Sequence, residues 1–332
     1  MITKICGVEN NKFINASYSK ASWQKHSSAF LCYKTFTKYD ACNMNWPLDT
    51  AKIIQFCKWM LDIKGLNPAT VESYVHTLKL MHEIQNLDCQ AFNSSAVKLT
   101  IKGASNLQLY VEQKSVQRNV VTLPMLRIIG HRIAGQVWDQ QSKHIIWVAC
   151  CLAFFGSLRM GEILFENERG FDPGASFLWE DVLEREGSLL CRIKSPKSKN
   201  KGGDYMDIFE FPGKNCCPVK AFKKWKVLVG PKKPNDPVFS FGNGKLLTKT
   251  NFNRTISGLL KDFEAKGAKI SGHSFRAGVP ATLAKFPEIV NDDHIMGWGR
   301  WSSKAYLSYT RLKIDQKRKI FEKIVKCLEN KW

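Results

Sequence analysis

Apolar residues recur at near-helical spacing through the first hundred residues of the chain. One helix is predicted to begin after Ser22. A second is predicted with Asp49 or Thr50 as its N-cap, and a third with Asn67 as its N-cap. The residues expected on their buried faces are Trp23, Ala29, Phe30 and Tyr33, then Ile53, Ile54, Phe56, Cys57, Met60 and Leu61, then Val71, Tyr74, Val75, Leu78 and Met81. The pattern predicts a small all-helical domain.

A polar stretch over residues 113–119 interrupts this periodicity and is the candidate linker. One or two weakly marked helices are expected between residues 86 and 110. A new helix is predicted at Thr122, with a proline in its first turn. The predicted organisation is therefore a helical domain over residues 1–112, a linker over 113–121 and a second domain over 122–332.

The second domain changes its pattern along its length. Residues 144–155 are almost continuously apolar and predict a helix buried in the core. Residues 188–194 and 204–211 predict two strands, joined by a loop rich in lysine and glycine. Helices resume from about Pro218 and end in a basic amphipathic segment over residues 315–332. The fold class is therefore mainly α with a small β-sheet.

Charge and composition narrow the possible partners. The chain has 50 Lys and Arg against 29 Asp and Glu, a net charge of +21, which favours a polyanionic partner such as nucleic acid or an anionic membrane surface. The longest apolar run, residues 145–158, is too short to span a bilayer, and the N-terminus lacks the apolar core of a secretion signal. We therefore expect no membrane partner.

The 11 cysteines are odd in number and contain no Cys-x-x-Cys spacing. This arrangement suits neither a zinc site nor a regular disulfide framework. Reduced, mostly buried thiols are the expectation.

Three segments carry residues that can hold a phosphate. In the first, Arg159 follows the predicted buried helix, and Glu162 lies one turn further on, where it can orient the guanidinium group. The alternative is an ordinary Arg–Glu ion pair on a helix surface. In the second, His273 and Arg276 share one helical face, so that both can approach one phosphate. The alternative there is a surface histidine near the start of a helix.

The third segment, residues 297–311, places two tryptophans and two tyrosines among basic side chains. Aromatic residues at this density often belong to a core. A tyrosine that acts as a nucleophile, by contrast, needs cations beside its phenol to stabilise the phenolate and the transferring phosphoryl group. Arg159, Arg276 and His273 would meet that need.

The order of these features resembles the catalytic series of tyrosine recombinases. An arginine in Leu-Arg-x-x-Glu is followed by lysines on a hairpin, by His-x-x-Arg, by Gly-Arg-Trp and by a tyrosine ten residues after that glycine. The N-terminal part is similar to the family's core-binding domain, including Ser-Trp-Gln-Lys-His from Ser22 and Asn-Trp-Pro from Asn45. Residues 299–309 most resemble recombinases of Crypton and DIRS mobile elements. The resemblance implies a helical, SAM-like core-binding domain followed by a mixed α/β catalytic domain.

The resemblance also implies roles for single residues. Tyr309 would attack the scissile phosphorus, with Tyr306 as the competing candidate. Arg159 and Arg276 would clamp the non-bridging phosphate oxygens. His273 would assist proton transfer to and from the nucleophile, for which a group that titrates near neutrality is suited.

A lysine of the hairpin loop would protonate the leaving 5′-oxygen. Lys199 is the first choice for this role, and Lys194, Lys197 and Lys201 remain alternatives. Lys197, Lys201 and Arg300 are also expected to contact DNA.

A further hydrogen bond to the phosphate is expected from a tryptophan, because an indole N–H is a donor only. Trp301 is the first choice and Trp298 the alternative. Glu162 would orient the first arginine.

The implied function is site-specific recombination or integration of a mobile element through a 3′-phosphotyrosyl intermediate, with neither metal nor ATP as cofactor. The implied partners are double-stranded DNA, held in a C-shaped clamp, and further copies of the chain, assembled as a tetramer on DNA through the C-terminal helix. A eukaryotic host would imply a nuclear location. The alternatives are a DNA-relaxing enzyme resembling type IB topoisomerases and a domesticated DNA-binding protein without catalytic activity.

Overall fold

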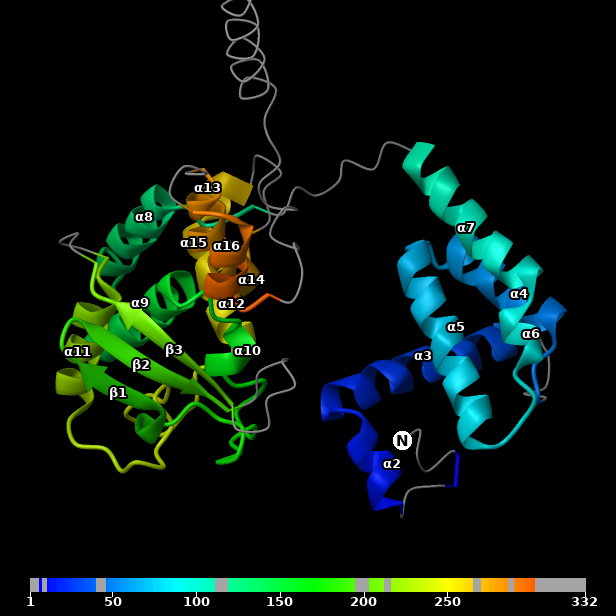
Figure 1. Ribbon diagram of the computed structural model, residues 1–332, viewed down its shortest axis with the longest axis horizontal. Coiled ribbons are helices and arrows are strands. Elements are labelled where there is room, and N and C mark those ends of the chain that lie inside the picture. The colour runs from blue at the N-terminus through cyan, green and yellow to red at the C-terminus, as the bar shows by residue number, and fades with distance from the viewer. Residues whose placement is uncertain are drawn as a thin grey trace, which may run out of the picture. The chain divides into compact units, whose positions relative to one another are not determined.

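The computed structural model describes residues 6–7, 11–39, 46–110, 119–194, 203–211, 216–264, 270–285 and 290–301. The chain divides into two compact units, Met1–Ser115 and Val116–Trp332 (Figure 1). Each has its own hydrophobic core.

The first unit is helical throughout its described part. Its elements are α2 (Lys12–Ser17), α3 (Lys20–Tyr39), α4 (Thr50–Lys58), the π-helical turn η1 (Trp59–Ile63), α5 (Pro68–Ile84), α6 (Gln90–Asn93) and α7 (Ser95–Tyr110). Of the two N-cap candidates for α4, the structure selects Asp49, whose carboxylate accepts a hydrogen bond from the Lys52 amide at 2.7 Å. Asn67 caps α5 as expected. The short helix α2 was not expected from the sequence.

Aromatic rings from α3 and α4 meet in the core of the first unit. Tyr33 contacts Phe56 edge to face, with 5.2 Å between the ring centroids, and Phe36 packs against the same Phe56 ring. All three side chains are buried. Such pairs stabilise a core beyond the apolar area that they remove from water.

The second unit combines helices with one small sheet. Its elements are α8 (Leu123–Ala134), α9 (Gln140–Phe155), α10 (Met160–Ile163), the 3₁₀ turn η2 (Trp179–Asp181), β1 (Val182–Arg185), β2 (Ser188–Ile193), β3 (Asp204–Phe209), α11 (Pro218–Val229), α12 (Lys249–Leu259), α13 (Lys261–Glu264), α14 (Gly272–Arg276), α15 (Gly278–Leu283) and α16 (Asp292–Gly299). The mainly helical class with a small sheet is confirmed. The C-terminal helix expected over residues 315–332 lies outside the described residues.

The sheet is antiparallel, with strand order β1-β2-β3. β2 and β3 are the two strands predicted from the sequence, paired from Ser188↔Phe209 to Ile193↔Asp204. β1 was not predicted, because it is a four-residue edge strand whose side chains alternate only between half-buried and exposed. In the sequence, residues 195–202 lie between β2 and β3, whose pairing extends to Ile193↔Asp204.

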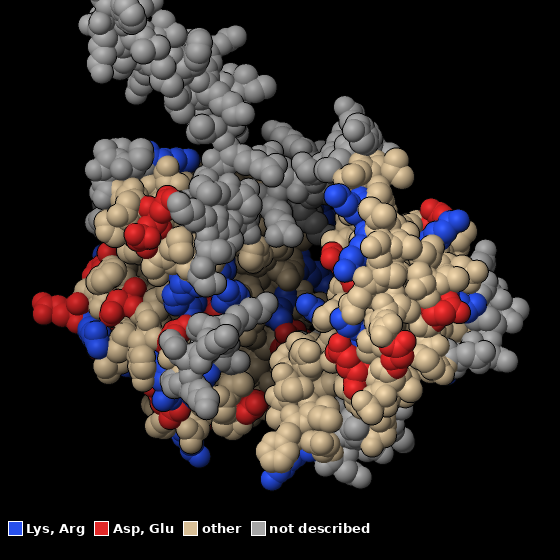
Figure 2. All heavy atoms as spheres, turned by 45° about the vertical axis from the view of Figure 1, so that its right-hand side comes forward, with Lys and Arg blue, Asp and Glu red and all other residues tan. Residues whose placement is uncertain are grey.

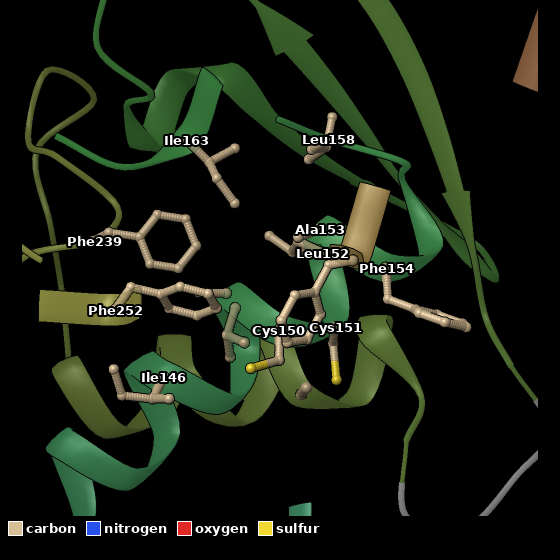
Figure 3. Packing of buried hydrophobic residues seen from close by; sticks show 14 of the residues in the cluster. Ile146, Cys150, Cys151, Leu152, Ala153, Phe154, Leu158, Ile163, Phe239 and Phe252 are labelled. Atoms are coloured by element: carbon tan, nitrogen blue, oxygen red, sulfur yellow. The ribbon is translucent and has the colours of Figure 1, made fainter. Parts of the chain in front are cut away.

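Helix α9 is the central element of the second unit. Its residues from Val148 to Phe154 are all buried, as the apolar run predicted. Figure 3 shows five of them, from Cys150 to Phe154, in one cluster with Ile163, Phe239 and Phe252 from other parts of the unit. A helix that is apolar on every side can only be stable when other elements surround it. The chain segment that leaves its C-terminal end is therefore held in a fixed position.

The nine cysteines in the described part of the chain are free thiols, and seven of them are buried. Burial raises the pKa of Cys150 and Cys151 well above the ordinary value. They are packing residues, as expected. None of the described helices is long and apolar enough to cross a membrane.

A buried histidine connects α5 to the segment before α4. The His82 Nδ1–H donates to the Leu78 carbonyl at 2.8 Å, and Nε2 accepts from the Leu48 amide at 2.9 Å. Both bonds require the neutral ring, because a second proton on Nε2 would face an N–H donor. Burial accordingly lowers the pKa of His82.

We expect acidification to destabilise the first unit through His82. The pKa of His82 is lower in the folded chain than in the unfolded chain, where a histidine has a pKa of about 6.5. As the pH falls through that value, the unfolded chain takes up the proton and the folded chain does not, so protonation favours unfolding. The free energy of unfolding should therefore fall as the pH drops from 7.5 to 5. Calorimetric unfolding of the whole protein at several pH values should show this dependence weakened in His82→Gln. The exposed His131→Gln is the control, and equal pH dependence in all three proteins would contradict the assignment.

Candidate active site

The site is built where the chain leaves α9. Arg159 is the N-cap residue of α10, and its backbone N–H donates to Glu162 Oε2 at 2.7 Å. Its guanidinium group donates to Glu162 Oε1 at 2.8 Å, and 28% of the Arg159 side chain remains exposed. The Glu162 side chain is only 3% exposed. The pair is thus an anchored guanidinium group on a buried carboxylate, rather than the surface ion pair that was the alternative.

Two further arginines reach the same carboxylate. Arg300 Nη2 donates to Glu162 Oε2 at 2.8 Å, and Arg276 Nη1 lies 4.0 Å from that oxygen. The three arginines come from the start of α10, the end of α14 and the residue after α16. Glu162 therefore joins segments that are more than 130 residues apart in the chain.

Arg276 is 1% exposed, and backbone carbonyls fix its position. Its guanidinium group donates to the carbonyl oxygens of Ser157 and Gly299. Ser157 adopts a left-handed conformation, with φ 46°, in the turn between α9 and α10. This turn directs its carbonyl toward Arg276.

Glycines at the starts of α14 and α15 allow Arg276, which lies between them, to lie this deep. A Cβ on Gly272 would lie 2.2 Å from the Met160 side chain, and a Cβ on Gly278 would lie 2.3 Å from the Phe154 ring. Both contacts are shorter than van der Waals packing permits. The start of α14 therefore packs closely against α10, and the start of α15 against α9, because both positions lack a side chain.

The two tryptophan candidates have different surroundings. The Trp298 indole N–H donates to the Phe155 carbonyl at 3.2 Å. The Arg276 guanidinium group lies over the Trp301 ring, with 5.7 Å between Cζ and the ring centroid. An indole has a single N–H donor, so a Trp298 bound in this way has none left for a phosphate. This hydrogen bond disfavours Trp298 as the phosphate donor.

Arg300 was expected to contact DNA. Its side chain is 12% exposed and lies against two carboxylates, with Nη1 3.7 Å from Asp204 and Nη2 on Glu162, and its contact with DNA stays a prediction. The residue has φ 51°, a left-handed conformation that costs a non-glycine residue roughly 1 kcal/mol. An arginine at such a position is consistent with the ion pairs outweighing this cost.

The other predicted residues divide into two groups. His273 lies on α14, three residues before Arg276, and is exposed to solvent. Lys194 lies just after β2, and its ammonium group binds Glu180 and Asp181, each at 3.0 Å. Because the Lys194 ammonium group is held by these two carboxylates, Lys194 is disfavoured as the proton donor. The predicted residues that lie outside the described part of the chain are Lys197, Lys199, Lys201, Tyr306 and Tyr309.

The centre is suited to binding an anion. Three guanidinium groups lie against two carboxylates, those of Glu162 and Asp204, so the cluster has an excess of positive charge. Fixed donors of this kind stabilise negative charge that develops on a phosphate without having to reorganise. Within the described residues, no group of His, Cys, Asp and Glu is arranged to hold a metal ion.

The sequence did not indicate three parts of this centre. They are the ion pair between Arg300 and Glu162, the neighbouring Asp204 and the carbonyl contacts of Arg276. Except for the contact between Arg276 and Gly299, each of these interactions joins residues that are at least 90 positions apart in the chain. The spacing of residues within a short segment cannot predict such a pairing. A left-handed residue occupied by arginine also has no sequence signal.

Comparison with known proteins identifies the fold. No family model matches the sequence, and no curated protein matches it. Among solved structures, the XerH site-specific recombinase bound to a difH substrate matches with a TM-score of 0.62 and 15% identity, over 96% of this chain and 82% of that one. The Tn1549 transposon integrase in complex with transposon right-end DNA matches with 0.58 and 15%, over 98% and 99%.

A lambda integrase dimer bound to a core site matches with a TM-score of 0.55 and 12% identity, over 94% of this chain and 98% of that one. The matches extend over both units. The chain therefore has the two-domain fold of tyrosine recombinases and integrases, a helical core-binding domain followed by a mainly helical domain with a small sheet.

Removing the charge of Glu162 should destabilise the second unit strongly. Glu162→Gln keeps the shape of the side chain and leaves three guanidinium groups without their shared carboxylate. Breaking a buried ion pair in this way typically costs about 3–5 kcal/mol. Urea denaturation would measure the change in the free energy of unfolding.

Glu166→Gln is the matched control. Glu166 pairs with Lys249, but its side chain is 69% exposed, so we expect a loss below about 1 kcal/mol. Equal losses in the two variants would show that Glu162 does not organise the centre.

Proposed function

We propose that this chain is a tyrosine recombinase, which cleaves and rejoins double-stranded DNA through a covalent bond between Tyr309 and a 3′-phosphate. The observation that carries the proposal is the meeting of Arg159, Arg276 and Arg300 on Glu162, with Trp301 over Arg276, inside a recombinase fold. The two arginines named from the sequence as phosphate ligands lie 117 positions apart, yet they share one carboxylate.

The scissile phosphate would bind against the guanidinium groups of Arg159 and Arg276. Arg159 keeps part of its side chain exposed while Glu162 fixes the other part, so that it can bind an anion without losing its orientation. The indole N–H of Trp301 would add one donor. These groups would stabilise the additional negative charge on the phosphoryl oxygens in the transition state.

The proposed reaction exchanges one phosphate ester for another. The Tyr309 oxygen forms a bond to phosphorus, and the bond from phosphorus to the 5′-oxygen breaks. His273 assists removal of the phenol proton, and Lys199 gives a proton to the leaving 5′-oxygen. Attack of a DNA 5′-hydroxyl on the phosphotyrosine reverses these steps and rejoins a strand, so the cycle consumes neither ATP nor an oxidant.

The hairpin supports a lysine in this role. Asp204, the first residue of β3, lies 3.7 Å from Arg300, so the strand that follows residues 195–203 in the sequence begins beside the arginine centre. Lys197, Lys199 and Lys201 all belong to this loop. Lys199 is our choice for the proton donor, and Lys197 and Lys201 would bind the DNA backbone.

Charge supports double-stranded DNA as the partner. Lys and Arg side chains occur on both units on the face that Figure 2 shows, with Asp and Glu between them, and the net charge of the chain is +21. Phosphate contacts made by two basic domains would let them close around a duplex as a clamp. The affinity for DNA should then fall steeply with salt.

The finer assignment rests on residues 299–309, which resemble recombinases of Crypton and DIRS mobile elements. We therefore propose strand exchange at the ends of such an element. The apolar stripe within residues 315–332 would join protomers into a tetramer on DNA, and a eukaryotic host would place the protein in the nucleus.

A covalent adduct tests the chemistry. The wild-type protein should form a denaturation-resistant complex with nicked suicide duplexes drawn from the ends of its native element, with no metal added. Tyr309→Phe should abolish it, because the variant lacks the nucleophilic oxygen, whereas Tyr306→Phe should retain it. Gel electrophoresis under denaturing conditions would measure the yield.

Three outcomes would contradict the proposal in different ways. An adduct that survives Tyr309→Phe but not Tyr306→Phe would move the nucleophile to Tyr306. Specific duplex binding without an adduct on any native end would indicate a DNA-binding protein without catalytic activity. Relaxation of supercoiled DNA without a requirement for a specific site would indicate a topoisomerase.

A further inference from the structure

A second cationic site lies at the other end of α9. A pocket of about 470 Å³ opens between α8, α9 and α11, and His144 of α9 contributes to its wall. His144 precedes Phe155 by eleven helical residues, which is about 16 Å along the axis. The arginine centre begins beyond Phe155, so the two sites are separated by most of the length of the helix.

The walls of the pocket are strongly basic. Every charged side chain that lines it within the described residues is cationic, and there is no carboxylate among them. The basic and imidazole side chains are Arg127, His131, Lys143, His144, Lys220 and Lys224. On α8 and on α11, the pairs 127/131 and 220/224 are spaced four apart, so each helix presents a short row of these groups on one face.

Much of this charge has no partner within the described part of the chain. Lys143 donates to the Ala134 carbonyl at 3.0 Å, and Lys220 lies 3.2 Å from Glu210. Arg127 and Lys224 form no ion pair with another described residue. An anionic ligand would therefore find cations that are not already neutralised.

Apolar residues also line the pocket. Ile133 and Ala221 are buried there, and the Trp147 ring packs against Gly130, whose missing Cβ would lie 2.9 Å from the ring. Small-molecule and peptide pockets commonly combine such an apolar lining with a few polar groups. The ligand should therefore carry an apolar group as well as negative charge.

Several occupants are disfavoured by charge and shape. A DNA duplex presents phosphates on a convex surface and has no apolar group to place against the apolar lining of the pocket. Residues 315–332 carry six Lys and Arg against three Asp and Glu, and the whole chain is basic, so neither this segment nor a second copy is complementary in net charge.

We propose that the α8–α9–α11 pocket binds an acidic peptide segment of a different protein, with one apolar side chain against Trp147 and carboxylates on the basic rows. The site would let a partner protein attach to the second unit at a distance from the arginine centre. The proposal stands independently of the proposed strand exchange.

Fluorescence anisotropy with defined peptides tests it. The probes are labelled 12-residue peptides of Glu and Asp with one central Phe, Leu, Ile or Trp, each matched by a peptide with Gln and Asn in place of the acids. The whole protein should bind at least one acidic peptide tenfold or more tightly than its neutral counterpart. High salt should weaken this binding.

Two kinds of variant locate the binding. The double substitution Arg127→Glu with Lys224→Glu should weaken the acidic peptide at least tenfold. Ala134 is an exposed residue of the pocket lining, and Ala134→Trp should weaken binding of the acidic peptide by filling the pocket. The control is Lys232→Glu with Lys245→Glu, which changes the net charge equally at exposed positions outside the pocket.

The outcomes separate the alternatives. Loss of peptide binding in the pocket variants alone supports the site. No preference for acidic peptides, or an equal loss in the control, overturns it. A pocket variant that weakens duplex DNA rather than peptide would identify the pocket as a DNA contact and would also overturn the proposal.

Discussion

The carboxylate of Glu162 is the interaction on which the candidate active site depends. It is nearly inaccessible to solvent and lies within 4.0 Å of guanidinium groups from three separate segments. Without a negative charge among them, three buried or half-buried guanidinium groups would repel one another and lose much of their solvation. One carboxylate therefore allows the chain to concentrate positive charge, and the remaining excess is available to an anion.

The helix α9 makes this concentration possible in a small domain. Its buried residues anchor the turn that carries Ser157 and Arg159, and the close approach of α14 at Gly272 and of α15 at Gly278 brings Arg276 to the same place. Arg300 then connects Glu162 to Asp204 at the start of β3. Core packing thus determines where the charged groups of the arginine centre lie. The basic pocket lies at the opposite end of α9.

Periodicity and capping residues predicted much of the fold. The apolar run over residues 144–155 is the buried part of α9, and the capping preferences at Asp49 and Asn67 mark the starts of α4 and α5. The edge strand β1 escaped prediction because a half-buried strand of four residues leaves almost no alternation. In the candidate site, Arg159, Arg276 and Glu162 were indicated by local motifs and by resemblance. Arg300 was given a different role, because its ion pair with Glu162 depends on how α16 ends in space.

The central claim is that the arginine centre neutralises the scissile phosphate. A suicide duplex that carries an uncharged methylphosphonate at the scissile position tests it directly, in combination with Arg159→Ala. We predict that this variant forms little covalent adduct on the ordinary phosphate and recovers adduct formation on the methylphosphonate, because the charge that the guanidinium group would balance is gone. If the methylphosphonate restores nothing to Arg159→Ala while the wild-type protein cleaves the ordinary duplex, Arg159 does not serve to neutralise that phosphate.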